Sequence, residues 1–342
     1  MLKSLPIIAV VTRETRLEGL KARWVTAGAA AFRMQQAVGH EVELRRARRV
    51  KQGVKIGRAE EAMMLAEVEA LADESEYESE DAVYQRTVRQ LMSELELGFP
   101  VKKIDRSFLA NFDFGRCVLV VVIGQDGLVA NTAKYVGDLP IVAINPDPAR
   151  NDGVLLPFAV EEARSVVRRV LDRKSRSREV TLAEVSTNDG QRMLAFNDFY
   201  VGCASHVSAR YTIEADLQSE SQSSSGVLVS TGAGSTGWMS SLFNMAGGFC
   251  RFTRVHEPPV VTMKWEDRQL LWAVREPFRS RHSSAELVAG FLPEGNELVI
   301  GSQMPAGGVI FSDGVEADYL EFNSGSIARF TVSKQRARLV VR

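Results

Sequence analysis

The chain has 342 residues, which favours two domains at about 100–200 residues per domain. It carries 42 Lys and Arg against 43 Asp and Glu, a net charge of -1, and this balance argues against a protein that coats nucleic acid or anionic lipid. The longest apolar run, Cys117–Ile123, is too short to cross a membrane, which needs about 20 residues.

The cysteines and histidines form no metal-binding pattern. Cys117, Cys203 and Cys250 have no paired spacing, which suits a reducing cytosol and predicts neither a zinc site nor a disulfide. The four histidines are scattered along the chain. We therefore expect a cytoplasmic protein without a metal site built from these residue types.

The first half of the chain alternates strand-like and helix-like segments. The apolar run Ile7–Val11 is typical of a parallel strand that is buried on both faces. Ala29–Val38 reads as a helix ended by Gly39, and Ala62–Leu71 could form another. The best supported helix of this region has five apolar residues on one face at helical spacing. They are Tyr84, Val88, Leu91, Met92 and Leu95.

The charge inverts within this half of the chain. Leu44–Arg58 is strongly basic, and Glu60–Asp81 is strongly acidic. The basic run indicates either a surface for phosphate or a partner, or a solvated face, which is the commoner reason for such runs. The sequence leaves both interpretations open.

A strand–turn–helix–strand unit follows. Val118–Ile123 has the composition of a buried strand, Gly124–Gly127 is a turn, Leu128–Val136 is helical, and Ile141–Ile144 is a second strand. Such a βαβ unit places two parallel strands in one sheet with a right-handed crossover.

The pattern changes near residue 155. After a last helix, Ala159–Arg173, short strands begin with a hairpin of Val180–Ser186 and Arg192–Val201 around Asp189-Gly190. The serine-rich stretch Ser219–Ser225 is interpreted as a loop. We expect an α/β domain with a parallel sheet in residues 1–155 and an all-β domain, a β-sandwich, in 156–325. A C-terminal segment, 326–342, is expected to return to the first domain.

The first candidate motif is the turn Gly124-Gln125-Asp126-Gly127. Glycines let a ligand approach the backbone, and the N–H groups at a helix start can bind phosphate. Asp126 stands at the carboxyl end of a parallel strand, where open α/β sheets bind their ligands. A carboxylate beside phosphates is suited to binding magnesium or to accepting a proton from an attacking hydroxyl. An ordinary turn in which Asp126 caps the helix remains the alternative.

The second motif is the polar pair Asn197-Asp198, which is surrounded by Phe196, Phe199 and Tyr200. Successive strand residues point to opposite faces, so the pair cannot both face an apolar core. Burial of such a pair costs free energy unless each side chain has a partner. The pair therefore indicates either a ligand site or a strand end at which both side chains reach water.

The third motif is a loop of small residues that follows the apolar strand Val227–Val229. Its hydroxyls and glycines offer many hydrogen-bond donors in little space, which suits a polyphosphate or a ribose. It lacks the Gly-Lys-Ser/Thr ending of a P-loop, and a serine–glycine linker is the alternative. The loop reads Thr231-Gly232-Ala233-Gly234-Ser235-Thr236.

Together and in this order, the three motifs resemble the NAD kinase family. Its signatures are a Gly-Gly-Asp-Gly turn, an Asn-Glu/Asp pair and a Thr-Pro-Thr-Gly-Ser-Thr loop. Four further segments look most like the mitochondrial-type branch of that family, and the resemblance covers about residues 110–335. The segments are Asn145-Pro146-Asp147-Pro148, Ser224–Trp238, Arg275-Glu276-Pro277 and Phe311-Ser312-Asp313-Gly314.

The resemblance implies transfer of the terminal phosphoryl group of ATP to the 2′-hydroxyl of the adenosine ribose of NAD or NADH, with Mg²⁺. Asp126 would be catalytic, activating that hydroxyl or helping to place the metal. Asn197 and Asp198 would hold the adenosine and ribose. The other implied binding residues are Gly124, Gln125, Gly127, Thr231, Gly234, Ser235 and Thr236. The resemblance also implies that the first domain binds nucleotide, that the second binds the dinucleotide, and that the chain forms a homodimer or homotetramer.

The chain departs from the family pattern in the first motif. Gln125 stands where the family has a second glycine, and Leu128 replaces the usual threonine. Two alternatives remain open: another small-molecule kinase of the sugar or lipid type, and a nucleotide-binding regulator without catalysis. Against a lipid kinase, the sequence has no basic amphipathic helix for a membrane surface. Asp313-Gly314 matches a late element of the family and is given no catalytic role.

Overall fold

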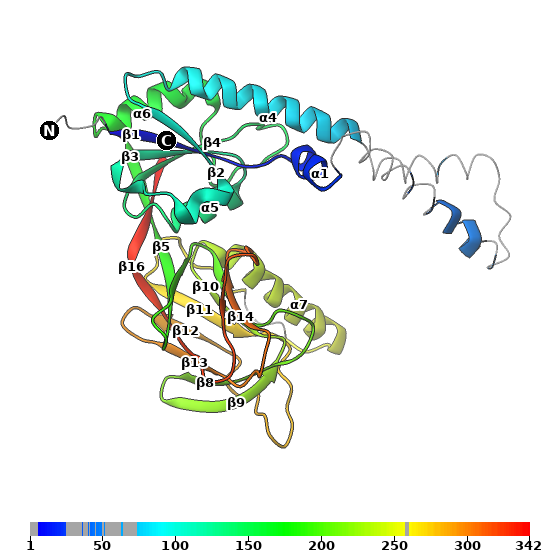
Figure 1. Cartoon of the computed structure of the whole chain (residues 1–342). Coiled ribbons are helices and arrows are strands. Elements are labelled where there is room, and N and C mark those ends of the chain that lie inside the picture. Colours follow the sequence, from blue (N-terminus) through cyan, green and yellow to red (C-terminus); the bar gives the residue numbers. More distant parts are fainter. Residues whose placement is uncertain are drawn as a thin grey trace.

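The computed structural model describes residues 6–24, 74–256 and 260–342, with short stretches between 36 and 63. The expected helices Ala29–Val38 and Ala62–Leu71, and much of the basic run Leu44–Arg58, lie outside these residues. Two lobes are joined by two long strands, β5 (Arg176–Thr187) and β16 (Ile327–Val341), which pair with each other in antiparallel orientation (Figure 1).

The first lobe is built on a parallel sheet with helices on both faces, as the alternating sequence pattern predicted. Helix α5 (Asp126–Ala133) packs on one face, and α4 (Glu74–Glu94) and α6 (Ala163–Leu171) pack on the other. A short helix, α1 (Arg16–Trp24), follows the first strand. In spatial order the strands are β2 (Val101–Asp105), β1 (Ile7–Thr12), β3 (Cys117–Ile123) and β4 (Pro140–Ile144).

Both local predictions in this lobe that bear on the site are confirmed. The predicted face of α4 is buried, with Tyr84 3% and Leu91 0% exposed. The strand–turn–helix–strand unit is β3, α5 and β4, with β3 and β4 parallel, although the helix runs over Asp126–Ala133 and not over the predicted Leu128–Val136. The end of β16 pairs in parallel with β4, with Leu339 opposite Ile141, so the last residues extend the sheet. The division of the chain at residues 155 and 325 stays a prediction.

The second lobe is the expected β-sandwich. One layer belongs to the ten-stranded sheet that continues from the first lobe through β16, and the other is a separate six-stranded sheet. Their inner faces share one apolar core, in which Phe199 and Phe330 meet edge to face. The first layer adds to β5 and β16 the strands β6 (Arg192–Ala195), β8 (Ala209–Ala215), β9 (Gln218–Ser224) and β13 (Leu298–Ser302). The second contains β7 (Asp198–Cys203), β10 (Val227–Ser230), β11 (Gln269–Val274), β12 (Ala289–Pro293), β14 (Gly308–Ser312) and β15 (Tyr319–Glu321).

The interpretation of Ser219–Ser225 as a loop was wrong, because most of it is strand β9, which pairs along its length with β8. The strand is stabilised by polar side chains that are satisfied inside the sandwich. The Tyr211 hydroxyl lies 2.8 Å from the Gln222 Oε1 and 2.7 Å from the Ser224 Oγ. Serine-rich composition therefore hid a buried hydrogen-bond network.

The predicted strand Arg192–Val201 was also wrong in its extent. The hairpin turn at Asp189-Gly190 is present, and β6 pairs with β5 as expected. The strand then breaks, because Phe196 and Asn197 carry the chain from one sheet to the other and β7 pairs with β10 and β14. The second motif thus lies where the chain changes sheets.

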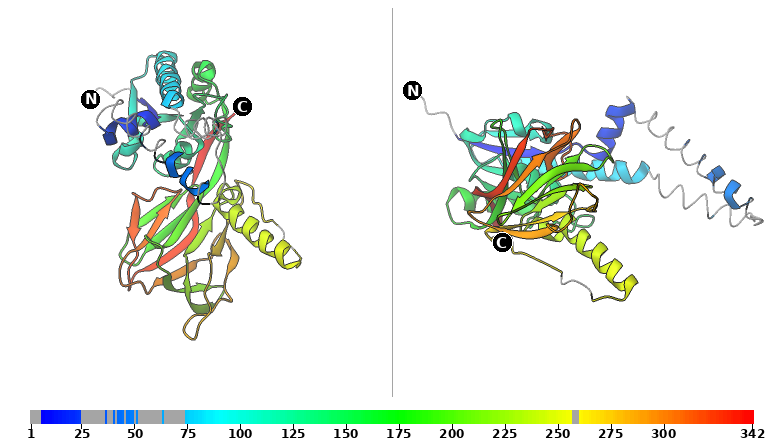
Figure 2. Two further views of the ribbon diagram at one scale, coloured as in Figure 1. Left: turned by 90° about the vertical axis from the view of Figure 1, so that its right-hand side faces the viewer. Right: turned by 90° about the horizontal axis from the view of Figure 1, so that it is seen from below.

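Helix α7 (Trp238–Thr253) projects from the second lobe (Figure 2). Of its residues, Met239 and Gly247 are buried, whereas Phe249 is 64% and Phe252 85% exposed. No helix in the described part of the chain is long and apolar enough to cross a membrane.

Candidate active site

The Gly124–Gly127 turn leads from the carboxyl end of β3 into the first turn of α5. Gly124 is buried, and a Cβ there would lie 2.8 Å from the Leu128 Cδ2, so packing explains this glycine. Gly127 is exposed, and a Cβ there would meet nothing within 4 Å. Since glycine weakens a helix and neither packing nor a positive φ requires Gly127, close approach of a ligand is the reason that remains.

The Asp126 carboxylate is held by the loop that follows β4. Its Oδ2 accepts a hydrogen bond from the Val154 N–H at 3.2 Å, and its Oδ1 accepts one from the Leu155 N–H at 2.9 Å. An ionised carboxylate has about four acceptor positions, so this oriented group retains capacity for a ligand. Asp126 is partly exposed at the edge of the sheet, and it does not cap α5 with its own side chain.

The Asn197 and Asp198 side chains have no hydrogen-bond partner among the residues that the structure describes. Asp198 is nevertheless buried, with 7% of its surface exposed. Burial, and to a lesser extent the nearby Asp313 carboxylate, raise the pKa of Asp198 to about 7. An unpartnered carboxyl group with such a pKa is typical of a functional site.

The third motif lies directly against this pair. The Thr231 N–H donates to the Asn197 carbonyl at 2.8 Å, and the Thr231 hydroxyl donates to the Phe196 carbonyl at 2.5 Å. A Cβ on Gly234 would lie 2.1 Å from the Asn197 oxygen, so only glycine allows this contact. The Ser235 hydroxyl is buried and donates to Gly232 at 2.8 Å. The structure thus gives the Thr231 and Ser235 hydroxyls backbone partners, whereas Thr236 is exposed.

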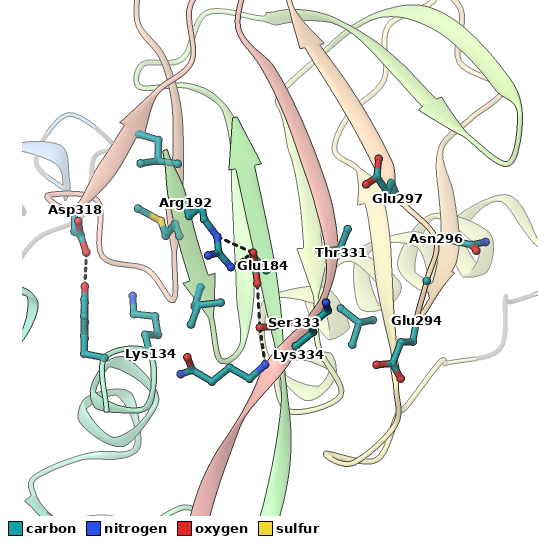
Figure 3. A pocket seen from close by; sticks show the side chains of 17 residues that line it. Lys134, Glu184, Arg192, Glu294, Asn296, Glu297, Asp318, Thr331, Ser333 and Lys334 are labelled. Carbon is teal, nitrogen blue, oxygen red and sulfur yellow. Dashed lines mark hydrogen bonds and ion pairs between the residues drawn. The ribbon is translucent and has the colours of Figure 1, made fainter. Parts of the chain in front are cut away.

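The first motif is joined to the other two through packing and one long side chain. Leu128 of α5, Phe196 and Ala233 belong to the same apolar cluster. Lys134, at the end of α5, places its Nζ 2.8 Å from the Ser312 Oγ in the second lobe. Figure 3 shows Lys134 beside the Tyr135–Asp318 hydrogen bond, which joins the same end of α5 to the loop between β14 and β15. The structure therefore brings Asn197, Asp198, Thr231 and Gly234 together, and it connects the first motif to them through the apolar cluster that Leu128 shares with Phe196 and Ala233.

Sequence reasoning missed the residues that support the first motif from α4 and the end of β1. The Tyr84 hydroxyl donates to the Ile123 carbonyl at 3.0 Å and accepts from the Arg13 N–H at 2.9 Å, which ties both strand ends together. Burial raises the pKa of Tyr84 to about 12, so the hydroxyl keeps its proton. The signal was the position of Tyr84 on the buried face of α4, where a tyrosine needs a partner for its hydroxyl.

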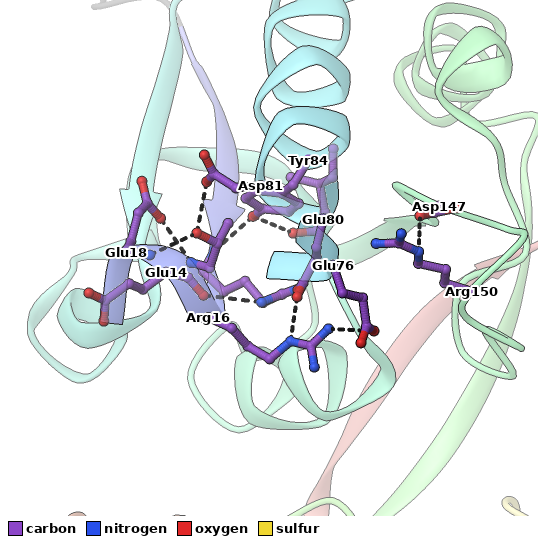
Figure 4. A network of polar contacts seen from close by, with 12 residues as sticks. Glu14, Arg16, Glu18, Glu76, Glu80, Asp81, Tyr84, Asp147 and Arg150 are labelled. Atoms are coloured by element: carbon purple, nitrogen blue, oxygen red, sulfur yellow. Dashed lines mark hydrogen bonds and ion pairs between the residues drawn. The ribbon is translucent and has the colours of Figure 1, made fainter. Parts of the chain in front are cut away.

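A hollow of about 390 Å³ lies beside the turn and is lined by Gln125, three arginines and three acidic residues. Arg13 pairs with Glu80 at 2.6 Å, and Arg16 pairs with Glu80 and Glu76 (Figure 4). Arg150 pairs with Asp147 at 3.7 Å. The charges in this hollow are therefore balanced by ion pairs within the protein.

The described residues contain no group of three His, Cys, Asp or Glu side chains that could hold a metal ion. Mg²⁺ does not require such a cage, because it usually keeps several waters and binds through one or two carboxylates and substrate phosphates. Asp126 is a carboxylate beside an exposed helix start and suits this role. The three cysteines, Cys117, Cys203 and Cys250, are free.

No protein-family model matches the sequence, and no curated protein matches it. Two solved structures match the fold. Yeast NADH kinase, complexed with NADH, has a TM-score of 0.55 at 14% identity over 100% of this chain and 85% of the kinase. An NAD kinase from Archaeoglobus fulgidus, in complex with ATP, has a TM-score of 0.52 at 17% identity over 74% of this chain and 89% of the kinase.

The chain has the NAD kinase fold. The α/β lobe with its parallel sheet and the β-sandwich that follows are the architecture expected from the three motifs. Within this fold the second and third motifs lie against each other, and the first is connected to them through one apolar cluster. The motif turn lies at the carboxyl edge of the parallel sheet, where α/β proteins bind their ligands.

Proposed function

We propose that this chain is a cytoplasmic kinase that transfers the terminal phosphoryl group of ATP to the 2′-hydroxyl of the adenosine ribose of NAD or NADH. The observation that carries this proposal is the Asp126 carboxylate, oriented by two backbone N–H groups at the carboxyl edge of the sheet. It is supported by the shared fold of two kinases, one complexed with NADH and one with ATP. We also propose, from the segments that resemble it, that the chain is most similar to the mitochondrial-type branch of these kinases.

In the proposed reaction, Asp126 accepts the proton of the 2′-hydroxyl while the ribose oxygen attacks the terminal phosphorus of ATP and ADP leaves. Phosphoryl transfer depends mainly on positioning and charge neutralisation. One carboxylate and a phosphate-binding turn are therefore sufficient for the proposed reaction. Asn197 and Asp198 hold the adenosine and ribose, since both have unused hydrogen-bonding capacity. Gly124, Gln125 and Gly127 form the turn against which the phosphates lie, with Gly234 and Thr236 on the other side.

Mg²⁺ is proposed as the cofactor, and it would neutralise charge on the polyphosphate. Asp126 is the residue that would hold it, together with oxygens of the substrate. Gln125 lines the same hollow as Arg13, Arg16 and Arg150. These arginines are the nearby cations that suit the phosphates of the donor. On binding, the phosphates would replace their acidic partners.

The proposal is tested by incubating the protein with ATP and Mg²⁺ and with either NAD or NADH. The expected product is heavier by one phosphoryl group and is a substrate for a dehydrogenase that accepts only NADP. If no product forms with either dinucleotide, the proposal is contradicted. Phosphorylation of a sugar or lipid acceptor instead would identify another small-molecule kinase, and binding of both nucleotides without product would identify a regulator.

Replacing Gly127 with alanine is expected to separate activity from stability. The substitution raises the free energy of unfolding by up to about 1 kcal/mol, because alanine favours the helix and its Cβ meets no protein atom. It lowers the rate of NAD phosphorylation by about tenfold or more, because the methyl group occupies the space of the ligand. Urea denaturation and initial rates measure the two effects. Gly248→Ala, in exposed helix α7, is the control that should change stability alone, and equal activity of both variants would contradict the role of Gly127.

Self-association is also proposed, through α7 and a second copy of the chain. Three exposed apolar residues of α7 recur at the spacing of a coiled-coil seam, and they are Met245, Phe249 and Phe252. Arg251 lies in the last turn of α7 and Arg254 follows its last residue, and residues 238–255 include no acid. A hollow of about 950 Å³ beside Trp238 is lined by Glu276, Glu316 and Glu321. An antiparallel pair of α7 helices would place the basic end of each copy near the acidic hollow of the other.

This contact predicts that Phe252→Glu converts the oligomer to a monomer, because it places a charge in the apolar seam. Light scattering coupled to size-exclusion chromatography measures the mass. Phe108→Glu is the matched control, since Phe108 is 63% exposed on the first lobe and its replacement should leave the mass unchanged. A parent protein that is already monomeric, or a Phe252→Glu variant with the parent mass, would contradict the contact.

A further inference from the structure

Asp313 is a buried carboxylate that the proposed chemistry does not use. It lies after β14 with its side chain 1% exposed and has a positive φ of 54°. Aspartate enters this left-handed region when its short side chain forms hydrogen bonds with nearby backbone, and such a conformation persists where its surroundings fix it. The conformation of Asp313 therefore requires compensating contacts.

Those contacts are made with the backbone of the second motif. The Asp313 Oδ2 accepts the Phe196 N–H at 3.1 Å, and the Oδ1 accepts the N–H groups of Asn197 at 2.6 Å and Asp198 at 3.3 Å. The Asp313 N–H donates back to the Asp198 carbonyl at 2.9 Å. Together with Thr231, which binds the carbonyls of Phe196 and Asn197, Asp313 fixes the backbone from which the unpartnered Asn197 and Asp198 side chains project.

Lys134 connects this arrangement to the first motif. Its Nζ lies 3.6 Å from the Asp313 Oδ2 and 2.8 Å from the Ser312 Oγ, with the side chain 3% exposed. Lys134 directly follows the last residue of α5, the helix that begins with Asp126. One buried ion pair therefore joins the rigid helix that presents Asp126 to the segment that presents Asn197 and Asp198.

A buried ion pair is weak evidence of a stabilising role, because desolvation offsets much of its attraction. Burial lowers the pKa of Lys134, and the Asp313 carboxylate opposes this shift. An ion pair that contributes little net stability but links two candidate ligand-binding elements is suited to fixing the position of one element relative to the other. A neighbouring contact between the two lobes is the Tyr135–Asp318 hydrogen bond, which lies beside Lys134 at a hollow of about 900 Å³ (Figure 3).

We propose that Lys134 and Asp313 are positioning residues that set the separation between the Asp126 carboxylate and the Asn197-Asp198 pair. This inference rests on the proposed function, because it assigns those two groups to opposite sides of one bound dinucleotide. Neither Lys134 nor Asp313 touches the reacting atoms.

The first test measures the geometry directly and does not need activity. In Asp313→Asn, an NH2 group that cannot accept a hydrogen bond replaces one carboxylate oxygen. The backbone N–H groups of residues 196–198 therefore lose a charge-assisted partner. Their hydrogen–deuterium exchange should become about 10–100-fold faster, as followed by mass spectrometry of the peptide that contains them. Tyr135→Phe is the matched control, because it removes the neighbouring contact between the two lobes and should leave these amides at the parent rate.

The second test measures the kinetic consequence. Lys134→Met leaves the Asp313 carboxylate buried and unpaired, which opposes folding. The double variant Lys134→Met/Asp313→Asn removes both charges, so its activity can be measured in a folded protein. The double variant should lower kcat for NAD phosphorylation by about 100-fold, since a misplacement of about 1 Å has that effect, with little change in the KM for ATP. Lys134→Arg, which keeps the charge, should recover part of the loss, and Tyr135→Phe should retain the parent kcat.

The outcomes separate this inference from the proposed function. Parent-like exchange at residues 196–198 in Asp313→Asn, or parent-like kcat in the folded double variant, would overturn the positioning role. A parent protein that phosphorylates neither NAD nor NADH would overturn the proposed function and with it the role assigned here. The exchange experiment would still show whether Asp313 fixes the backbone of the second motif.

Discussion

Asp126→Asn is expected to lower the rate of NAD phosphorylation by about 10²–10⁴-fold, the usual range for loss of a general base. The asparagine amide has nearly the shape of the carboxylate but cannot accept the proton of the ribose hydroxyl. It also carries no charge with which to hold a metal ion beside phosphates. Both roles considered for Asp126 therefore predict the same direction of change, measured as kcat at saturating ATP and NAD.

The stability of this variant has to be measured as well, because Asp126 also supports the loop after β4. Asparagine retains one oxygen acceptor for the Val154 and Leu155 N–H groups, so the free energy of unfolding should fall by about 1–2 kcal/mol. Asp113→Asn is the matched control. Its Oδ1 accepts the Gly115 N–H at 2.9 Å in the loop that leads into β3, at the opposite edge of the sheet. Asparagine caps a helix about as well as aspartate, so this control should keep the parent stability and activity; near-parental turnover in Asp126→Asn would contradict the proposed role of this carboxylate.

The local geometry of the first motif could be predicted from sequence because short-range physics determines it. A run of seven apolar residues can only be a buried strand here, and the glycines and Asp126 follow it at once. A strand that feeds a helix and a second parallel strand has one favoured handedness. These rules place Asp126 at the ligand-binding edge without knowledge of any distant residue.

The partners that orient the motif residues could not be predicted, because they are distant in the chain. Asp313 lies 116 residues from Asn197, whose N–H it binds, and Lys134 lies 178 residues from Ser312. No periodicity relates such positions. The break between β6 and β7 was missed for the same reason, since Phe196 is apolar and extends the strand pattern while its neighbours pair with different sheets.

Asp198→Asn is expected to stabilise the protein at alkaline pH, which is the opposite of the usual effect of removing a buried polar group. Burial and, secondarily, the Asp313 carboxylate raise the pKa of Asp198 to about 7 from 3.8. Between these two values the folded state binds more protons than the unfolded state, so stability falls as the pH rises. The unfavourable contribution is complete above about pH 7.

The asparagine variant has no such proton to lose, so its advantage over the parent should widen by about 2–3 kcal/mol between pH 5 and pH 8, at about 1.4 kcal/mol per unit of pKa shift. Urea denaturation at the two pH values measures this difference. Asp216→Asn, in an exposed turn where asparagine suits the positive φ of 47°, controls for the loss of one surface charge. If the difference in the free energy of unfolding between Asp198→Asn and the parent is the same at both pH values, Asp198 is ionised with a partner in solution. A gap that widens as expected and closes when NAD is added would instead locate the missing partner in the ligand, since binding to the folded parent stabilises it.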